Sequence, residues 1–412
     1  MNKRTFIFIS VAVLVLGFGA LLLVPKKWEL SVNNLIPVSE PNLVPHSLTL
    51  PDGTEAKFRI AEPFGINVAA ENLGKVRFMA RSSDGRIFVP DIVNYNLSHN
   101  GKLYVLGGFD EESGRFTEKD TYLSGLRGPN SVAFYTDAEG NEWLYLALTA
   151  HLIRYPYTPG DTRPSGQGQI ITTFPNTQTP GETSVVWHIT RTLLFHKDLL
   201  YIAIGSGCNS CEQPETEMRG MVMVMEPDGS NARVYADGLR NSVGLAVANG
   251  SLYATANGVD HLGADAPNET MFRLEEGVHY GWPYCYESNG AMRPDTTGIW
   301  NVEFSCEAVP RPLTAFAPRS APLGLTYFAQ AHPVLEGSFL VALHGSFDVS
   351  MGTGYEVRRV GLLGTDHLFM DGFLSSEGER VGRPVDFLQH DTNSFFMTDD
   401  HAGVIYFVRA RP

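Results

Sequence analysis

A short unit recurs about six times along the chain: a turn, an apolar strand, a tight hairpin and a second strand, followed by a more variable segment. The copies centre on VRFMARSSDGRIFVPDI, GPNSVAFYTDAEGNEWLYLALT, TRTLLFHKDLLYIAIGSG, NSVGLAVANGSLYATANG, APLGLTYFAQAHPVLEGSFLVALHG and RPVDFLQHDTNSFFMTDDHAGVIYFV. Asp84-Gly85 and Asn249-Gly250 are strong hairpin signals, because such residues adopt the positive backbone angles of a tight turn. A unit of this kind cannot bury its faces alone, so neighbouring copies must pack together.

This repetition predicts an all-β protein, a six-bladed β-propeller over residues 44–412. The 41 glycines and 25 prolines are spread along the whole sequence, which is typical of turns between short strands. A β-sandwich is the main alternative, but its strands are too few for about 370 residues. In a propeller the innermost strands and their loops converge on the central axis at one face, so a functional site is expected there.

The amino-terminal segment predicts a membrane anchor. Residues 5–24 form an uncharged, mostly apolar run, which at about 1.5 Å per residue reaches across the roughly 30 Å hydrocarbon core of a bilayer. Lys3 and Arg4 precede the run, and no typical signal cleavage site follows it. We therefore predict an uncleaved anchor or transmembrane helix over residues 1–27, a tether over residues 28–43, and a domain on the extracytoplasmic side. A removed signal peptide is the alternative.

The four cysteines fit an oxidising compartment. Cys208 and Cys211 lie in GCNSCE, and Cys285 and Cys306 flank a variable segment rich in glycine and proline. We predict that each cysteine pairs with its local neighbour, although four cysteines allow three connectivities. Four buried thiols are the alternative interpretation.

Basic and polar side chains recur at equivalent places, directly before or after the predicted innermost strands. They are His188, Arg191, Arg240, Asn241, His344 and Arg383. The formal net charge of −14 argues against nucleic acid as the main partner, and the recurrence favours a shared pocket instead. An arginine fork suits carboxylates and quinone oxygens, and a histidine can take a proton near neutral pH. The alternative for any one arginine is a salt bridge between blades.

The segment after the fourth repeat is rich in oxygen donors. Asp260, Asp265 and Glu269 are interleaved there with glycine and free backbone carbonyl groups, a composition that can hold Ca²⁺. The pattern does not match an EF-hand, and a solvated acidic loop explains the composition equally well. The run Tyr-Gly-Trp-Pro at residues 280–283 places large aromatic rings on a turn, either as a plug between blades or as the wall of a pocket.

An ordered set of motifs resembles one protein family. HITRTLLF, GSGCNSCE, ADGLRNSVGLA, LGADAPNE, YGWPYCY, APLGLTYF, ALHGS, GYEVRRV and GRPVDF cover nearly all of residues 60–410. The set is similar to that of the soluble pyrroloquinoline-quinone-dependent sugar dehydrogenases, and most closely to their sorbosone dehydrogenase-like branch. No single motif is specific, but the ordered set is. The resemblance implies a six-bladed propeller, pyrroloquinoline quinone on its axis, and Ca²⁺ bridging the quinone to the protein.

The resemblance also implies roles for the matching residues. His188 would be the general base that removes the hydroxyl proton of a sugar or of an aldehyde hydrate, while hydride passes to the quinone. Arg240 would polarise the quinone carbonyl and stabilise the developing oxyanion. The implied cofactor-binding set is Arg191, Arg240, Asn241, His344 and Arg383. The implied Ca²⁺ set is Gly258, Val259, Asp260 and Glu269, the first two through backbone oxygens. Electrons would pass to a respiratory acceptor.

The chain departs from the family pattern at three places. A basic cofactor-binding residue is expected near residues 344–346, and none is present. Gly258 and Val259 stand where the related branch tends to carry an acidic residue and an arginine, and residues 347–349 read Phe-Asp-Val where it tends to carry Trp-Asn-Arg. These changes predict a pocket that has lost positive charge needed by a tri-anionic quinone. Two other functions therefore remain possible: a Ca²⁺-dependent propeller lactonase or hydrolase with His188 or an acidic residue as base, and a non-catalytic binding propeller.

Overall fold

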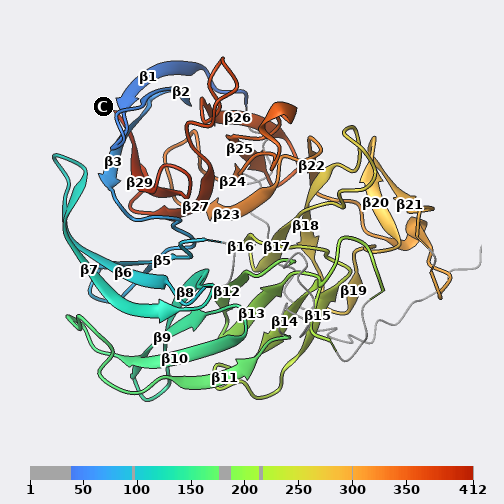
Figure 1. Cartoon of the computed structure of the whole chain (residues 1–412), viewed down its shortest axis with the longest axis horizontal. Helices are drawn as coiled ribbons and strands as arrows, with labels where there is room; N and C mark the ends of the chain where they lie inside the picture. Colours follow the sequence, from blue (N-terminus) through green and yellow to red (C-terminus); the bar gives the residue numbers. More distant parts are fainter. Residues whose placement is uncertain (1–38, 95–97, 176–186, 213–216, 299, 412) are drawn as a thin grey trace, which may run out of the picture.

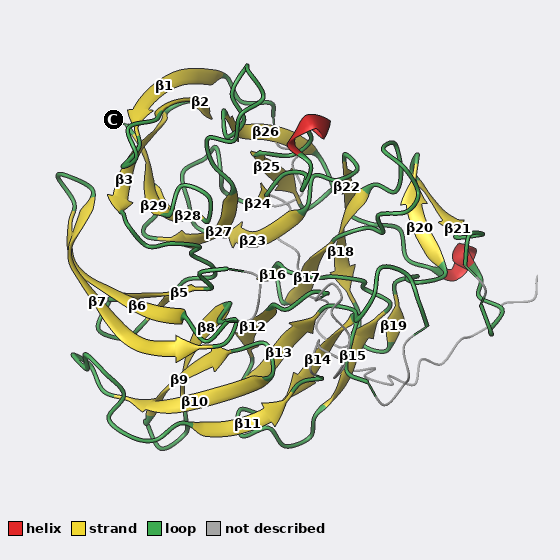
Figure 2. Ribbon diagram, in the orientation of Figure 1, coloured by secondary structure: helices red, strands yellow, loops and turns green. Residues whose placement is uncertain are grey.

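The computed structural model describes residues 39–94, 98–175, 187–212, 217–298 and 300–411. Within these ranges the regular structure is almost entirely β-strand, with two short 3-10 helices, η2 (Cys306–Ala308) and η3 (Val349–Met351) (Figure 2). Six mainly antiparallel sheets follow one another along the chain and stand around one centre (Figure 1). The predicted all-β six-bladed propeller is thereby confirmed.

The first three blades come in simple chain order. Blade 1 contains β4 (Ala80–Arg81), β5 (Ile87–Asp91), β6 (Gly101–Asp110) and β7 (Arg115–Leu126). Blade 2 contains β8 (Ser131–Thr136), β9 (Glu142–Ala147), β10 (His151–Tyr157) and β11 (Gln169–Thr173). Blade 3 contains β12 (Arg191–His196), β13 (Leu199–Ile204), β14 (Met221–Met225) and β15 (Arg233–Asp237), with the short β19 (Val278–His279) added in parallel at its outer edge.

The last three blades incorporate strands from elsewhere in the chain. Blade 4 contains β16 (Leu245–Ala248), β17 (Ser251–Ala256), β18 (Glu269–Leu274) and β22 (Thr314–Phe316), and a separate hairpin of β20 (Cys285–Ser288) and β21 (Ala291–Pro294) lies in the connection before β22. Blade 5 contains β23 (Pro322–Phe328), β24 (Ser338–Leu343), β25 (Glu356–Gly361) and β26 (Asp366–Asp371), extended by β2 (Glu55–Ala61) and β1 (Leu43–Thr49). Blade 6 contains β27 (Pro384–Gln389), β28 (Ser394–Asp399), β29 (Val404–Ala410) and β3 (Phe64–Ala70).

Each repeat identified in the sequence supplies the two innermost strands of one blade. The turn chemistry is as predicted: Gly85 has φ 85° between β4 and β5, and Asn249 and Gly250 have φ 49° and 76° between β16 and β17. The strand sequences also explain why neighbouring blades pack face to face. Every residue of β14, β24 and β28 is buried, because a blade packed between two neighbours is covered on both faces.

The ring is closed by pairing the two ends of the domain. The amino-terminal β3 forms an antiparallel ladder with β29 near the carboxyl terminus, and Figure 1 shows the blue and red strands side by side. Phe64 of β3 packs its ring against Phe395 of β28 and Phe369 of β26 within the largest apolar cluster. Pairing β3 with β29 completes blade 6 as a four-stranded sheet and ties the two ends of the domain together.

The predicted anchor over residues 1–27 and most of the predicted tether lie outside the described residues. In the part of the chain that the structure describes, no helix has both the length and the apolar character needed to cross a membrane. The first described strand, β1, begins at Leu43.

Candidate functional site

A pocket of about 740 Å³ lies where the loops before the innermost strands meet. Its lining includes Arg77, His188, Arg240, Arg319 and Arg383. Each of these residues lies a few positions before the innermost strand of its own blade: β4, β12, β16, β23 and β27, respectively. A pocket of this volume suits a small-molecule ligand. The propeller therefore brings together residues that are far apart in the sequence because they occupy the same place in the repeat.

His188 is held in one orientation by Ser206. The backbone of His188 is left-handed, with φ 41°, a conformation that a non-glycine residue seldom adopts. Its Nδ1 lies 3.0 Å from both the carbonyl oxygen and the hydroxyl oxygen of Ser206. Because the hydroxyl donates its own proton to the carbonyl oxygen of Cys208, Nδ1 must carry a proton, and Nε2 is left as the acceptor.

Burial keeps the His188 imidazole neutral. Burial lowers the pKa of His188 well below its ordinary value, and the positive charge of Arg240 lowers it further. His188 therefore has the protonation state that a general base needs at neutral pH. Gly205 gives it space: a Cβ there would lie 2.4 Å from the Cβ of His188 and 2.5 Å from Oδ1 of Asn241.

Arg191 does not line the pocket. It is the first residue of β12, is fully buried, and donates from Nη1 to the carbonyl oxygens of His188 (2.7 Å) and Thr190 (2.8 Å). Arg191 thus lies beside the pocket and outside its lining, and its contact with the cofactor stays a prediction. Its Nη1 ties down the loop that presents His188, whereas its buried Nε and Nη2 have no hydrogen-bond partner among the described residues.

Arg240 is fixed by Asn209 and Asp260. Its Nε donates to the backbone oxygen of Asn209 (2.9 Å), and its Nη2 donates to the side-chain oxygen of Asn209 (2.8 Å) and to Oδ2 of Asp260 (2.7 Å). The guanidinium carbon lies 5.7 Å from the ring centre of Trp187, within the range of a cation–π contact. Nη1 has no hydrogen-bond partner among the described residues, so one face of this fixed cation is available to a ligand.

The Cys208–Cys211 disulfide encloses the residue that holds Arg240. Both predicted local pairs, Cys208–Cys211 and Cys285–Cys306, are present. Asn209 lies inside the first pair, and its carbonyl oxygen also accepts the indole N–H of Trp282 at 3.1 Å. The short disulfide loop is therefore a support for the pocket.

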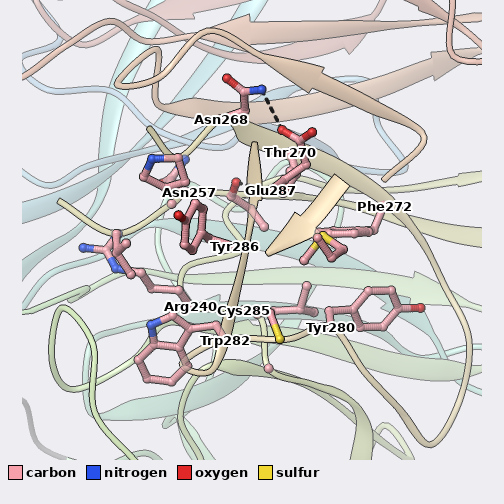
Figure 3. Close-up of a pocket in the computed structure, with 17 residues that line it drawn as sticks. Arg240, Asn257, Asn268, Thr270, Phe272, Tyr280, Trp282, Cys285, Tyr286 and Glu287 are labelled. Atoms are coloured by element: carbon pink, nitrogen blue, oxygen red, sulfur yellow. Dashed lines mark hydrogen bonds between the residues drawn. The ribbon is translucent and has the colours of Figure 1, made fainter. Parts of the chain in front are cut away.

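A smaller cavity of about 50 Å³ lies behind Arg240. Figure 3 shows Arg240 and Trp282 together at one end of it, with Tyr280 and Phe272 at the other, and a hydrogen bond from Asn268 to Glu287 drawn above. Tyr280 and Trp282 are both buried. The two aromatic residues of the Tyr-Gly-Trp-Pro turn have different roles. Trp282 forms a wall of this small cavity. Tyr280 donates to the carbonyl oxygen of Arg273 at 3.0 Å and packs inside blade 4.

Asn241 lines the pocket beside Arg240. Its Nδ2 donates to Oδ1 of Asn257 at 2.9 Å, and Asn257 in turn donates to the carbonyl oxygen of Pro322 at 2.9 Å. Oδ1 of Asn241 is buried and has no hydrogen-bond partner among the described residues. A buried acceptor in this state is a position that a ligand donor or a water molecule would satisfy.

His344 and Arg77 share one buried carboxylate. Asp400 accepts from Nη1 of Arg77 and from Nε2 of His344, each at 2.8 Å, and all three side chains are almost fully buried. Burial lowers the pKa of His344 to about 4, although Asp400 opposes that shift. His344 is therefore neutral at neutral pH and acts as a hydrogen-bonding member of the pocket wall, while Arg77 and Asp400 form a buried ion pair.

Arg383 is oriented by backbone carbonyl groups. Its Nε donates to the carbonyl oxygen of His344 (3.0 Å), and its Nη2 donates to that of Gly345 (2.7 Å). The amide of Arg383 donates to the buried carboxylate of Asp399 (2.9 Å), which fixes the start of β27. These two backbone acceptors orient the guanidinium towards the pocket that it lines.

The residues predicted to bind Ca²⁺ lie together at the edge of the pocket. Gly258, Asp260 and Glu269 line it, and Val259 is buried directly behind. The two carboxylate oxygens of Glu269 accept the amides of Gly258 (2.6 Å) and Arg319 (3.1 Å). Burial raises the pKa of Glu269 to about 7. Glu269 therefore shapes the backbone of the loop.

Arg319 is the main residue that the sequence reasoning missed at this edge. Its guanidinium bonds the carbonyl oxygens of Val259 and Asp260 and pairs with the Asp260 carboxylate. With Arg77 it brings two further guanidinium groups to the pocket lining. Each is paired with a carboxylate, Arg319 with Asp260 and Arg77 with Asp400, so the predicted loss of positive charge stays a prediction. Both arginines stand just before an innermost strand, as Arg240 and Arg383 do, and that positional signal could have identified them.

Comparisons with known proteins agree with this architecture. The TrAA12-like family matches residues 58–411. The solved carbohydrate-active enzyme of family AA12 from Trichoderma reesei superposes with a TM-score of 0.70 at 18% identity, over 91% of this chain and 99% of that one. The PQQ domain of pyranose dehydrogenase from Coprinopsis cinerea, solved in its holo form, gives 0.68 at 16% identity, over 86% and 97%.

Two further relatives extend the comparison. The PQQ-bound aldose sugar dehydrogenase of Streptomyces coelicolor gives a TM-score of 0.58 at 16% identity, over 85% of this chain and 99% of that one. An uncharacterised protein of Borreliella burgdorferi is 27% identical over 220 residues, which cover 50% of this chain and 56% of that protein. The chain thus spans about half the length of this curated relative. Because the family match covers nearly the whole propeller, the chain belongs to the TrAA12-like family.

Proposed function

We propose that this chain is a quinoprotein oxidoreductase that oxidises a sugar or a sugar aldehyde. The observation that carries the proposal is a neutral histidine with an unprotonated Nε2, placed in one pocket with guanidinium groups from four different blades. Those guanidinium groups belong to Arg77, Arg240, Arg319 and Arg383. The sorbosone or aldose type of substrate, implied by the resemblance, is part of the proposal.

The pocket fits a tri-anionic quinone. Arg240 and Arg383 are already oriented by backbone carbonyl groups, so little side-chain entropy is lost when an anion binds them. The buried, unpartnered Oδ1 of Asn241 offers a further polar contact. When bound, pyrroloquinoline quinone would supply the two-electron acceptor that protein side chains lack.

His188 and Arg240 would do the protein's share of the chemistry. Nε2 of His188 would take the hydroxyl proton of the substrate, and the carbonyl oxygen of Ser206 would stabilise the imidazolium through Nδ1. Arg240 would place a fixed positive charge where negative charge develops on a bound oxygen, and burial strengthens that interaction. No covalent bond to the protein is required.

The residues predicted to bind Ca²⁺ do not form an open set of ligands. Arg319 donates to the carbonyl oxygen of Val259, and both carboxylate oxygens of Asp260 pair with arginines. Both carboxylate oxygens of Glu269 accept backbone amides. In the described ranges, no group of three or more His, Cys, Asp or Glu side chains is placed to hold a metal. The proposed function therefore assigns these residues no metal.

We further propose that the enzyme is anchored in the membrane by residues 1–27, faces the extracytoplasmic side, and passes electrons to a respiratory acceptor. The two disulfides support an oxidising compartment. The apolar run over residues 5–24 supports the anchor.

A titration of the full-length protein in detergent with pyrroloquinoline quinone tests the proposed function. We expect stoichiometric binding by calorimetry and by the absorbance of the quinone, followed by dye reduction with an aldose, a ketose aldehyde or an alditol. Arg240→Ala should weaken quinone binding by at least about tenfold, since it removes a charge-assisted contact. Arg233→Ala, which removes an exposed arginine from β15, is the matched control and should bind like the wild type.

Failure of the wild type to bind the quinone and to reduce dye would overturn the proposal. Metal-dependent opening of a lactone without quinone would point to the hydrolase alternative. Unchanged cellular function in His188→Ala would point to a binding propeller.

A further inference from the structure

The Arg319 side chain occupies a group of oxygen atoms that resembles a metal site. Its Nη1 donates to the carbonyl oxygen of Val259 at 2.6 Å, and its Nη2 donates to those of Asp260 at 2.8 Å and Gly263 at 2.6 Å. Nη1 also lies 3.0 Å from Oδ1 of Asp260. Three carbonyl oxygens and one carboxylate oxygen therefore surround a single cationic group.

This set of oxygens has the chemistry of a hard-cation site. Ca²⁺ takes carboxylate and backbone carbonyl oxygens at about 2.3–2.6 Å. Lone pairs directed at a guanidinium cannot at the same time coordinate a metal at the same point, because the two cations would repel and overlap. Val259, the carbonyl donor predicted from the family resemblance, is one of the groups that Arg319 takes.

The loop before β23 holds Arg319 in this position. Its backbone is left-handed, with φ 68°, and its amide donates to Glu269 at 3.1 Å. The next residue, Ser320, is fully buried and donates to the carbonyl oxygen of Ala317 at 2.7 Å. The Arg319 side chain is only 12% exposed. The arginine is therefore anchored at both its backbone and its guanidinium.

Arg319 is also coupled to the centre of the pocket. The carboxylate of Asp260 joins two arginines, with Oδ1 paired to Arg319 and Oδ2 paired to Arg240 at 2.7 Å. Arg319 thus fixes the Asp260 loop, and Asp260 fixes Arg240. A divalent cation at the same oxygens would perform the same two tasks.

We propose that Arg319 serves as a permanent internal cation in place of a bound divalent metal, so that ligand binding by this pocket does not depend on Ca²⁺. The identity of the ligand rests on the proposed function above. The replacement of the metal rests only on the contacts of Arg319. Removing the guanidinium should uncover a site for Ca²⁺ that the wild type lacks.

Calorimetric titration with CaCl₂ alone tests the replacement without any quinone. We expect no stoichiometric binding to the wild type at about 1 mM Ca²⁺, a concentration at which weak protein sites are occupied. Arg319→Ala should gain one Ca²⁺ site. Arg319→Met, which keeps the apolar stem, should gain the same site and replaces the alanine variant in the test if that variant is unstable. Arg319→Lys should not gain it, because its ammonium keeps a charge in place. Arg233→Ala is the control for general loss of positive charge.

Quinone titration provides the second readout. Wild-type affinity should change by less than about twofold between excess EDTA and about 1 mM Ca²⁺, whereas Arg319→Ala should bind at least about tenfold more weakly in EDTA and recover with Ca²⁺. The proposal is overturned if the wild type binds Ca²⁺ stoichiometrically and loses it in Asp260→Asn, or if neither neutral variant gains a site. Absence of quinone binding in all variants would refute the proposed function and leave the calcium titration as the decisive test.

Discussion

The amide nitrogen of Ser206 donates to the carbonyl oxygen of Arg240 at a distance of 2.7 Å. The carbonyl oxygen of the same Ser206 holds Nδ1 of His188. One residue therefore joins the two side chains for which we propose the central chemical roles. The loop that begins at Ser206 sets their relative position, and a change in this loop should affect both.

Replacing His188 by glutamine should reduce kcat by about 10²–10⁴-fold, because the proposed general base is lost. Quinone binding should be retained, since the arginines remain. The two effects are separated by steady-state dye reduction and by quinone titration of the same sample. His196→Gln, at the other end of β12 and outside the pocket lining, is the matched control. Equal activity in the two variants would rule out His188 as the base.

The pH dependence of kcat/KM should report the low pKa of His188. Burial and the nearby charges of Arg240, Arg191 and Arg219 lower that pKa well below 6.5. Because the base must be neutral, activity is lost only as the pH falls through the lowered pKa. The acidic limb of the profile should therefore lie well below pH 6.5. A limb at or above pH 6.5 that disappears in His188→Gln would contradict the neutral, buried histidine.

The blade repeat could be predicted because it is encoded locally. The turn residues and the strand alternation both act over a few residues, and pairs such as Asn249-Gly250 need no tertiary context. The carbonyl contacts of Arg319 could not be predicted in this way, because they join positions 56 to 60 residues apart through a loop without a regular pattern. The structure places His188, Arg240 and Arg383 together as expected, and their roles stay predictions.

Arg191 shows the other limit of sequence reasoning. It stands three residues after His188, yet strand geometry directs it into the protein, where it bonds backbone carbonyl groups. Arg77 lies at the same repeat position as His188 and Arg383. Its guanidinium is held by Asp400, which is more than 300 residues away in the sequence. Only the closed ring brings such partners together.

The two disulfides should have different effects when removed. Replacing Cys208 and Cys211 by serine frees the loop that holds Arg240 through Asn209, so quinone affinity should fall by about tenfold. The chain-entropy model values this short loop at about 2 kcal/mol. Replacing Cys285 and Cys306 opens a longer loop, which the chain-entropy model values at about 3 kcal/mol. That variant should show a lower Tm with quinone affinity nearly unchanged.

Thermal unfolding and quinone titration of both double variants make this comparison. An equal fall in affinity for the two variants would show that the Cys208–Cys211 loop has no special role in orienting Arg240.

Asp386 should make the protein less stable as the pH rises towards neutrality. Burial raises the pKa of Asp386 to about 7, despite hydrogen bonds from the backbone amides of Met79 and Phe387. In the unfolded chain an aspartate titrates near pH 3.9. Between about pH 4 and 7 the folded state therefore binds more protons than the unfolded state, so the free energy of unfolding falls as the pH rises through this window.

Asp386→Asn removes that titration and keeps an oxygen that can accept the Met79 amide. The Tm of the variant minus that of the wild type should become more positive, by a few degrees, from pH 4.5 to 8. Asp84→Asn is the control of opposite sign, because hydrogen bonds and Arg86 outweigh burial and lower the pKa of Asp84 to about 2. Its Tm difference should be negative and nearly constant over the same range. A flat difference for Asp386→Asn would show that this carboxyl group is ionised in the folded protein at pH 5.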